Sequence, residues 1–140
     1  STQIDEQEHY PLYKRYINTR HADGDMFPPN LNQFRDFIGN LREYSRIVEI
    51  RCGDELIAAG VVDILEDGLS AIYTYYSTEP QHKKRSLGTF TILSEIMLAR
   101  EMDLSYLYLG YWIKDSPKMA YKSNYRPLEI LKDRQWTPLV

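Results

Sequence analysis

The sequence has almost no cysteine and no long apolar run. Cys52 is the only cysteine among 140 residues, so an intramolecular disulfide is excluded, and such usage is typical of a reducing compartment. No apolar stretch reaches the roughly 20 residues that a membrane-spanning helix needs. The first eight residues are polar and acidic and lack a signal-peptide pattern. From these absences we expect a cytoplasmic protein with no membrane association.

Metal-ligating residues are also sparse. The three histidines, His9, His21 and His82, are scattered, and no His/Cys pair has the spacing of a metal site. We therefore expect no metal. Cys52 follows a strand-like run without a neighbouring cationic cluster, so it is interpreted as a packing residue rather than a nucleophile.

Charge is distributed unevenly along the chain. Residues 1–81 contain 7 Lys/Arg and 14 Asp/Glu, whereas residues 82–140 contain 10 Lys/Arg and 6 Asp/Glu, within a net charge of −3. A basic C-terminal part suits a protein with one face that meets an anion. Dispersed surface charge is the alternative, since an excess of this size is modest.

The hydrophobic pattern predicts one α+β domain over residues 9–140, preceded by a linker of residues 1–8. Tyr13, Tyr16, Ile17 and Arg20 share a face of the first predicted helix. In the long helix, residues 87, 90, 93, 96 and 97 are expected to point to the core. The elements expected in order are a helix at 10–20, a helix after Asn30, an antiparallel meander of strands at 45–52, 55–65 and 69–77, a helix at 87–101, a strand at 104–111, a short helix, and a hairpin of 128–131 and 135–139.

The stretch from Tyr106 to Glu129 is the most informative one. An aromatic strand leads into a short helix in which Lys118 and Lys122 share a face with Tyr121 beside them, and Arg126 follows. Three cations and several phenols at one strand end are costly to bury unless they meet an anion. The pattern therefore predicts a site for a carboxylate or a phosphate.

Three blocks carry a resemblance to a known family. They are Leu-Gly-Tyr-Trp-Ile at 109–113 with Lys-Met-Ala-Tyr-Lys at 118–122 and Tyr-Arg-Pro-Leu-Glu at 125–129; Tyr16-Ile17, Arg20-His21, Gly24, Met26 and Pro28-Pro29; and Tyr73-Thr-Tyr-Tyr76 followed by Arg85-Ser-Leu-Gly-Thr89. In this order they resemble the aminoacyl-tRNA–protein transferases, which comprise bacterial aspartate/glutamate leucyltransferases and their arginyl-transferring relatives. The resemblance covers residue 10 to the end.

The resemblance implies a GNAT-like acyltransferase fold, and the order of predicted elements agrees with it. It also implies that a cysteine-rich N-terminal domain and an opening strand of the fold are absent from this chain. Members of the fold that use acetyl-CoA hold pyrophosphate at a loop before the long helix. Here Arg85 and Gly88 fit that loop, but Phe90 replaces its second small residue, which argues against CoA. The loop residues Lys83, Lys84, Arg85 and Gly88 are instead candidates for tRNA phosphates, and a solvated basic loop is the alternative.

The reaction implied is attack by a protein's N-terminal α-amine on the ester of an aminoacyl-tRNA, with no separate cofactor. His21 and Asp25 are candidate proton acceptors, and Tyr73, Tyr75 and Tyr121 are candidate donors to the oxyanion. Ordinary strand packing remains open for Tyr73 and Tyr75, and a structural loop role remains open for His21.

The acceptor proteins of the family begin with Asp or Glu, and an acidic side chain requires a fixed cation. Arg20, Lys118, Lys122 and Arg126 are the candidates, with structural ion pairs as the alternative for each. Leucine is the favoured donor, and arginine stays open. An acetyl-CoA-dependent N-acetyltransferase and a non-catalytic module that binds acidic N-termini are the competing functions.

Overall fold

The structure, a computed structural model, describes residues 4–20, 29–39, 41–110, 125, 128–132 and 134–138. It divides into two compact units, Ser1–Tyr108 and Leu109–Val140, and each is described by itself. The predicted extent of one domain, residues 9–140, stays a prediction.

Unit 1 is built on a four-stranded sheet in the order β1-β2-β3-β4. The strands are β1 (Ser45–Cys52), β2 (Glu55–Ile64), β3 (Gly68–Tyr76) and β4 (Tyr106–Tyr108). The first three pair antiparallel in sequence order, while β4 pairs parallel with β3. The predicted meander is therefore confirmed, with strand ends that differ from the prediction by at most one residue. The fourth strand is shorter than the predicted 104–111, because its pairing with β3 ends at Tyr108.

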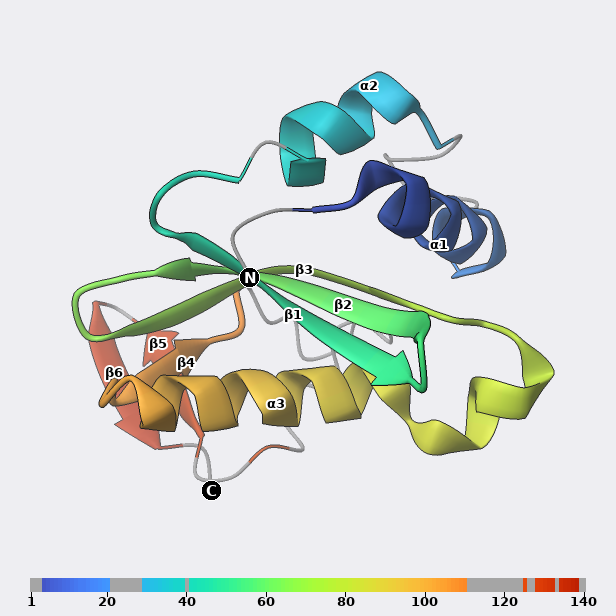
Figure 1. The fold of residues 1–140 in the computed structure, drawn as a ribbon. Helices are drawn as coiled ribbons and strands as arrows, with labels where there is room; N and C mark the ends of the chain where they lie inside the picture. Colours follow the sequence, from blue (N-terminus) through green and yellow to red (C-terminus); the bar gives the residue numbers. More distant parts are fainter. Residues whose placement is uncertain are drawn as a thin grey trace. The chain divides into compact units, whose positions relative to one another are not determined.

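One face of the sheet is covered by α1 (Glu6–Arg20), α2 (Leu31–Phe34) and the π-helical turn η1 (Arg35–Gly39), as Figure 1 shows. The inward face predicted for the first helix is confirmed for Tyr13, Tyr16 and Ile17, which are buried. The helix begins at Glu6 rather than near residue 10, because the Asp5 carboxylate accepts a hydrogen bond from the Gln7 amide and caps the first turn. Residues 6–8 of the predicted linker therefore belong to the helix.

The second predicted helix begins where expected. The Asn30 side chain accepts hydrogen bonds from the amides of Asn32 and Gln33, which is the geometry of an N-cap. Phe34 and Ile38 are fully buried against α1 and the sheet. Together with the tyrosines of α1 and β3 they form the larger core of unit 1.

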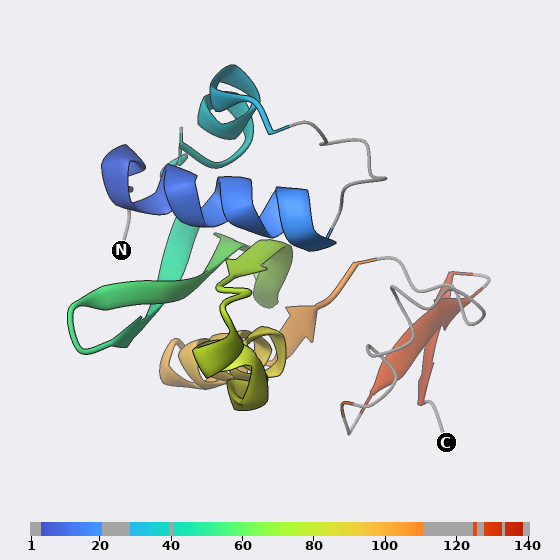
Figure 2. The same cartoon turned by 90° about the vertical axis from the view of Figure 1, so that its right-hand side faces the viewer.

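The opposite face of the sheet is covered by α3 (Leu87–Glu101), which follows the 3₁₀ turn η2 (Pro80–Arg85) (Figures 1 and 2). The predicted bounds of this helix are confirmed, as is the inward position of Leu87, but the rest of its predicted inward face is wrong. Phe90, Leu93 and Met97 are 50%, 47% and 62% exposed, and Ile96 is only partly buried. The residues that α3 buries are Leu87, Thr91, Ile92, Glu95 and Ala99.

The reason for this rotation is Gly60 in β2. A Cβ atom at Gly60 would lie 2.8 Å from Thr91 Cγ2 and 3.1 Å from Glu95 Oε1, so the bare backbone accommodates those two side chains. The apolar residues of α3 point to nearly every side of the helix, so their spacing does not single out the face that packs on the sheet. Contact with a glycine in another element decides it, and the helical period could not reveal that contact.

Unit 2 contains a hairpin of β5 (Glu129–Lys132) and β6 (Gln135–Pro138). The predicted closing hairpin is confirmed, and Arg134 at its turn has a φ of 65°. The helix expected to carry Lys118 and Lys122 lies outside the described residues. Among the helices that the structure describes, none has the length and apolar character to cross a bilayer.

Candidate functional site

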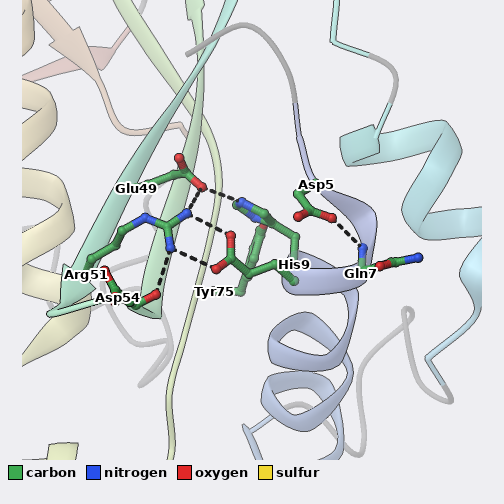
Figure 3. A network of polar contacts seen from close by, with 8 residues as sticks. Asp5, Gln7, His9, Glu49, Arg51, Asp54 and Tyr75 are labelled. Carbon is green, nitrogen blue, oxygen red and sulfur yellow. Dashed lines mark hydrogen bonds and ion pairs between the residues drawn. The ribbon is translucent and has the colours of Figure 1, made fainter.

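A closed polar network joins α1 to the sheet in unit 1 (Figure 3). His9 is fully buried; its Nδ1 lies 2.7 Å from the Tyr75 hydroxyl, and its Nε2 lies 2.8 Å from Glu49 Oε2. Because a carboxylate only accepts, Nε2–H donates to Glu49, and in the neutral ring Nδ1 accepts from the Tyr75 hydroxyl. Both ring nitrogens and the buried phenol therefore have partners.

Arg51 extends this network to the surface. Its guanidinium donates to both carboxylate oxygens of Glu8, at 2.8 and 2.7 Å, and to Glu49 at 3.0 Å. This fork-to-fork geometry is the strong form of an ion pair, and it lowers the pKa of Glu8 below its ordinary value. Glu8, His9 and Glu49 offer ligand atoms close enough for a metal ion, but the Arg51 guanidinium already pairs with both carboxylates. The network therefore serves to hold α1 on the sheet.

Tyr73 and Tyr75 face α1 because β3 has a bulge. Val61 pairs with Tyr73 and Val62 with Ala71, which leaves Ile72 as the extra residue. Tyr75 is fully buried and Tyr73 partly buried, and both pack against the ring of Tyr13. Burial raises the pKa of both phenols. This arrangement favours the packing alternative for Tyr75, and the oxyanion role of either tyrosine stays a prediction.

The start of α3 is the part of the predicted tRNA site that the structure describes. Arg85 is exposed, and its guanidinium lies 3.6 Å from Cys52 Sγ at the end of β1. Gly88 lies in the first turn of the helix, where a Cβ atom would come within 3.2 Å of the Tyr76 ring. The need for a glycine at position 88 is thus explained by helix–strand packing as well as by the predicted phosphate contact. Lys83 and Lys84 belong to η2, but their side chains lie outside the described residues.

Cys52 corrects one prediction. It is exposed rather than packed in the core, because it lies in the last position of β1 beside the turn at Gly53. A guanidinium from 33 residues further along the chain approaches it, and no local sequence pattern indicated that neighbour.

A second buried histidine lies just before the basic loop. His82 is 4% exposed, and its Nδ1 lies 2.7 Å from Ser77 Oγ and 3.8 Å from Glu79 Oε2. Glu55, Glu79 and His82 also offer ligand atoms within 4.8 Å of one another, and Arg15 pairs with Glu79 at 3.6 Å. His9 and His82, which are far apart in sequence, thus each gain carboxylate neighbours in space. The expectation of no metal stays a prediction.

Several predicted site residues cannot be placed. His21, Asp25, Lys118, Tyr121, Lys122 and Arg126 lie outside the described residues, and only the backbone of Arg20 is described, at the end of α1. The structure therefore brings together Tyr73 and Tyr75, whose ring centroids are 6.2 Å apart, and it leaves the remaining proposed catalytic and cationic groups as predictions.

The strands β3 and β4 pair over a short stretch. They pair only over Gly68–Ser70 and Tyr106–Tyr108, so within unit 1 the remainder of β3 is paired on its β2 side alone.

Comparison with known proteins assigns the chain to a family. Residues 8–132 match the model of the arginine-tRNA-protein transferase C terminus. The chain belongs to this family. The three sequence blocks predicted the same family.

Relatives of known name agree. The chain is 51% identical over 131 residues to an aspartate/glutamate leucyltransferase of Acinetobacter baylyi, covering 94% of this chain and 48% of that protein. It is 48% identical over 130 residues to an aspartate/glutamate leucyltransferase of Chromohalobacter salexigens, covering 93% and 53%. The chain thus spans about half the length of the relatives it matches.

A solved structure supports the fold. The ribosomal-protein-S18-alanine N-acetyltransferase of Escherichia coli superposes with a TM-score of 0.61 at 14% identity, covering 87% of this chain and 72% of that one. This likeness confirms the predicted GNAT-like α+β fold and carries no statement about substrate.

Sequence reasoning missed His9 with Glu49 and Arg51, and it missed Glu95. Alternation along β1 signals that Glu49 and Arg51 share one face, but nothing local pairs them with α1. For Glu95 a signal existed, namely a carboxylate within a helix that is otherwise almost wholly apolar from residue 90 to 99.

Proposed function

We propose that this chain is the GNAT-like part of an aminoacyl-tRNA–protein transferase. It moves an amino acid from charged tRNA to the N-terminal α-amine of proteins that begin with Asp or Glu, and so marks them for degradation. The observation that carries the proposal is the family match over residues 8–132, together with leucyltransferase relatives near 50% identity. The cytoplasm is the proposed location.

The chemistry requires positioning and the removal of one proton. An α-amine has a pKa of about 8, so much of it is protonated at neutral pH and a base has to accept a proton before attack. The ester of aminoacyl-tRNA is already activated, so orientation and stabilisation of the oxyanion supply much of the remaining acceleration. In this proposal His21 or Asp25 accepts the proton, and Tyr73, Tyr75 or Tyr121 donates to the oxyanion. The aminoacyl-tRNA is the co-substrate, and no further cofactor takes part.

Recognition of the acceptor protein is assigned to cations. Arg20, Lys118, Lys122 and Arg126 are the residues proposed to meet the acidic first side chain, since a fixed cation discriminates a carboxylate from a neutral group. The exposed Arg85, with Lys83 and Lys84, is proposed to meet tRNA phosphates beside the N-terminus of α3. Tighter binding of tRNA at low salt than at high salt is the expected signature of such contacts.

Leucine is the proposed donor. The sequence blocks around Leu109–Ile113 and Arg126–Glu129 favour the leucyl branch, and the relatives described above carry that name. Arginine is the second candidate, because Ser116-Pro117-Lys118-Met119 also resembles the arginyl branch.

A transfer assay tests the proposal directly. Labelled Leu-tRNA and Arg-tRNA are offered separately with peptides that begin with Asp, Glu or Ala, with and without the N-terminal half of a full-length relative. Transfer of leucine to the Asp and Glu peptides alone supports the proposal. Transfer of an acetyl group from acetyl-CoA instead, or binding of Asp peptides with no transfer even when the other half is supplied, contradicts it in favour of the two competing functions.

A further inference from the structure

Glu95 is a buried acid that no part of the proposed reaction uses. It lies on the inner face of α3 and is fully buried, and neither carboxyl oxygen has a hydrogen-bond partner among the residues that the structure describes. Its Oε1 lies 3.1 Å from the position of a Cβ atom at Gly60, so the carboxyl rests against the bare backbone of β2. Buried polar groups in native proteins are almost always satisfied, so an orphan acid at a helix–sheet contact needs an explanation.

Within the described part of the chain, no neighbouring charge compensates this carboxyl. Among the described elements that pack against α3, the titratable or charged side chains on the facing surfaces are Arg46 of β1, Tyr76 of β3, and His82 and Arg85 of η2. On β4 the residue that packs toward α3 is Leu107, so its neighbours Tyr106 and Tyr108 point to the other face. The Arg46 guanidinium donates to the carbonyls of Glu43 and Ser45, and His82 and Arg85 contact Ser77 and Cys52. None of the bonds within the described part of the chain reaches Glu95.

The protonation state of Glu95 follows from this environment. An ionised carboxylate without a partner is far costlier to bury than a neutral acid. Burial alone accordingly raises the pKa of Glu95 to about 8. When α3 leaves the sheet, water reaches the carboxyl and its pKa returns to the ordinary value. The docked and undocked states of the helix therefore bind different numbers of protons across the window between those two pKa values.

We propose that docking of α3 on the sheet takes up one proton, which Glu95 carries into the core. Because the pKa of Glu95 is raised in the docked state, docking is strongest below the ordinary carboxyl pKa. It weakens as pH rises between the ordinary and the raised pKa, and it stays constant above the raised pKa. The helix begins directly after Arg85, and its first turn packs on Tyr76 through Gly88. A rise in pH thus loosens the element that positions the basic loop, which makes the loop's geometry proton-linked.

Hydrogen exchange of the buried α3 amides in the 140-residue chain tests the proposal. After correction for intrinsic exchange, the opening constant of wild type is expected to rise about tenfold per pH unit between pH 5 and 8 and to level off above 8. Glu95→Gln removes the titrating group and is expected to lack this component. Glu101→Gln, an exposed change in the same helix, is the matched control and keeps the wild-type slope. Histidine contributions are common to all three proteins and cancel in the difference.

An equal slope in Glu95→Gln and wild type would overturn the proposal. A second measurement needs no variant: the side-chain carboxyl carbon of Glu95 is followed by NMR during a pH titration of the folded wild-type protein. A midpoint near 8 supports the proposal. A midpoint at the ordinary glutamate value contradicts it, whatever the variants do.

Discussion

The two faces of the sheet in unit 1 treat buried polar groups in opposite ways. On the α1 face, the Tyr75 hydroxyl and both nitrogens of His9 are satisfied, and the chain of contacts ends in exposed ion pairs. On the α3 face, Glu95 is equally buried and has no hydrogen-bond partner in the described ranges. The free-energy cost of burying a polar group depends on whether it has hydrogen-bond partners. One small domain can therefore use a buried polar group either to hold a helix on the sheet or to make the docking of a helix depend on pH.

Loss of His9 is expected to have the largest effect on this comparison. His9→Ala removes a fully buried ring, leaves a cavity and leaves the Tyr75 hydroxyl without its partner. The free energy of unfolding is expected to fall by about 3 kcal/mol, measured by urea denaturation. Gln7→Ala, an exposed change in the same helix, is the control and should stay close to wild type. A loss below about 1 kcal/mol for His9→Ala would mean that the network contributes little.

Filling the hollow at Gly60 tests the α3 face next. Gly60→Ala places a methyl group 2.8 Å from Thr91 Cγ2, so overpacking is expected to cost about 2 kcal/mol. Thr91→Ser deletes the Cγ2 methyl group of Thr91 and keeps the hydroxyl that donates to the Leu87 carbonyl. The double variant should recover part of the loss in thermal or urea unfolding. Simple additivity of the two losses would show that the contact with Thr91 is not the cause.

Tyr75→Phe probes a single hydrogen bond on the satisfied face. The ring packing against Tyr13 is retained, but Nδ1 of His9 loses its donor inside the core. The expected loss of stability is about 1.5 kcal/mol, smaller than for His9→Ala. The same variant is informative in the transfer assay, because an unchanged rate would assign Tyr75 to packing alone.

The surface end of the network is expected to matter least. Arg51→Met keeps an unbranched side chain but removes the pairs with Glu8 and Glu49. Because Arg51 lowers the pKa of Glu8, the pair contributes stability above the ordinary carboxyl pKa, and that contribution is lost as pH falls through the lowered value. A small loss in unfolding midpoint at low salt and neutral pH should shrink at high salt, since Arg51 is exposed and both partners are partly exposed. A loss that salt leaves unchanged would contradict a surface role.

Local patterns were sufficient for the elements of this fold and insufficient for its contacts. Alternation and turn residues located β1 to β3, because Gly53-Asp54 and Glu66-Asp67-Gly68 end the strands within the sequence itself. The inward face of α3 depended on Gly60, and the partners of His9 came from β1 and β3, which are long-range facts that no period encodes. The family blocks identified the fold and the family, whereas the side chains of most of the proposed site residues lie outside the described part and remain to be placed.

The three-residue pairing of β3 with β4 has a consequence for how unit 1 assembles. The hairpins β1–β2 and β2–β3 close through short turns, so their contacts are local and their loop-closure entropy is small. Gly68 meets Tyr106 only after the whole of α3 has been laid across the sheet. The meander is therefore expected to gain protected amides before α3 and β4 in pulse-labelled refolding. During synthesis the sheet face that contains Gly60 is therefore expected to stay uncovered until α3 has been synthesised.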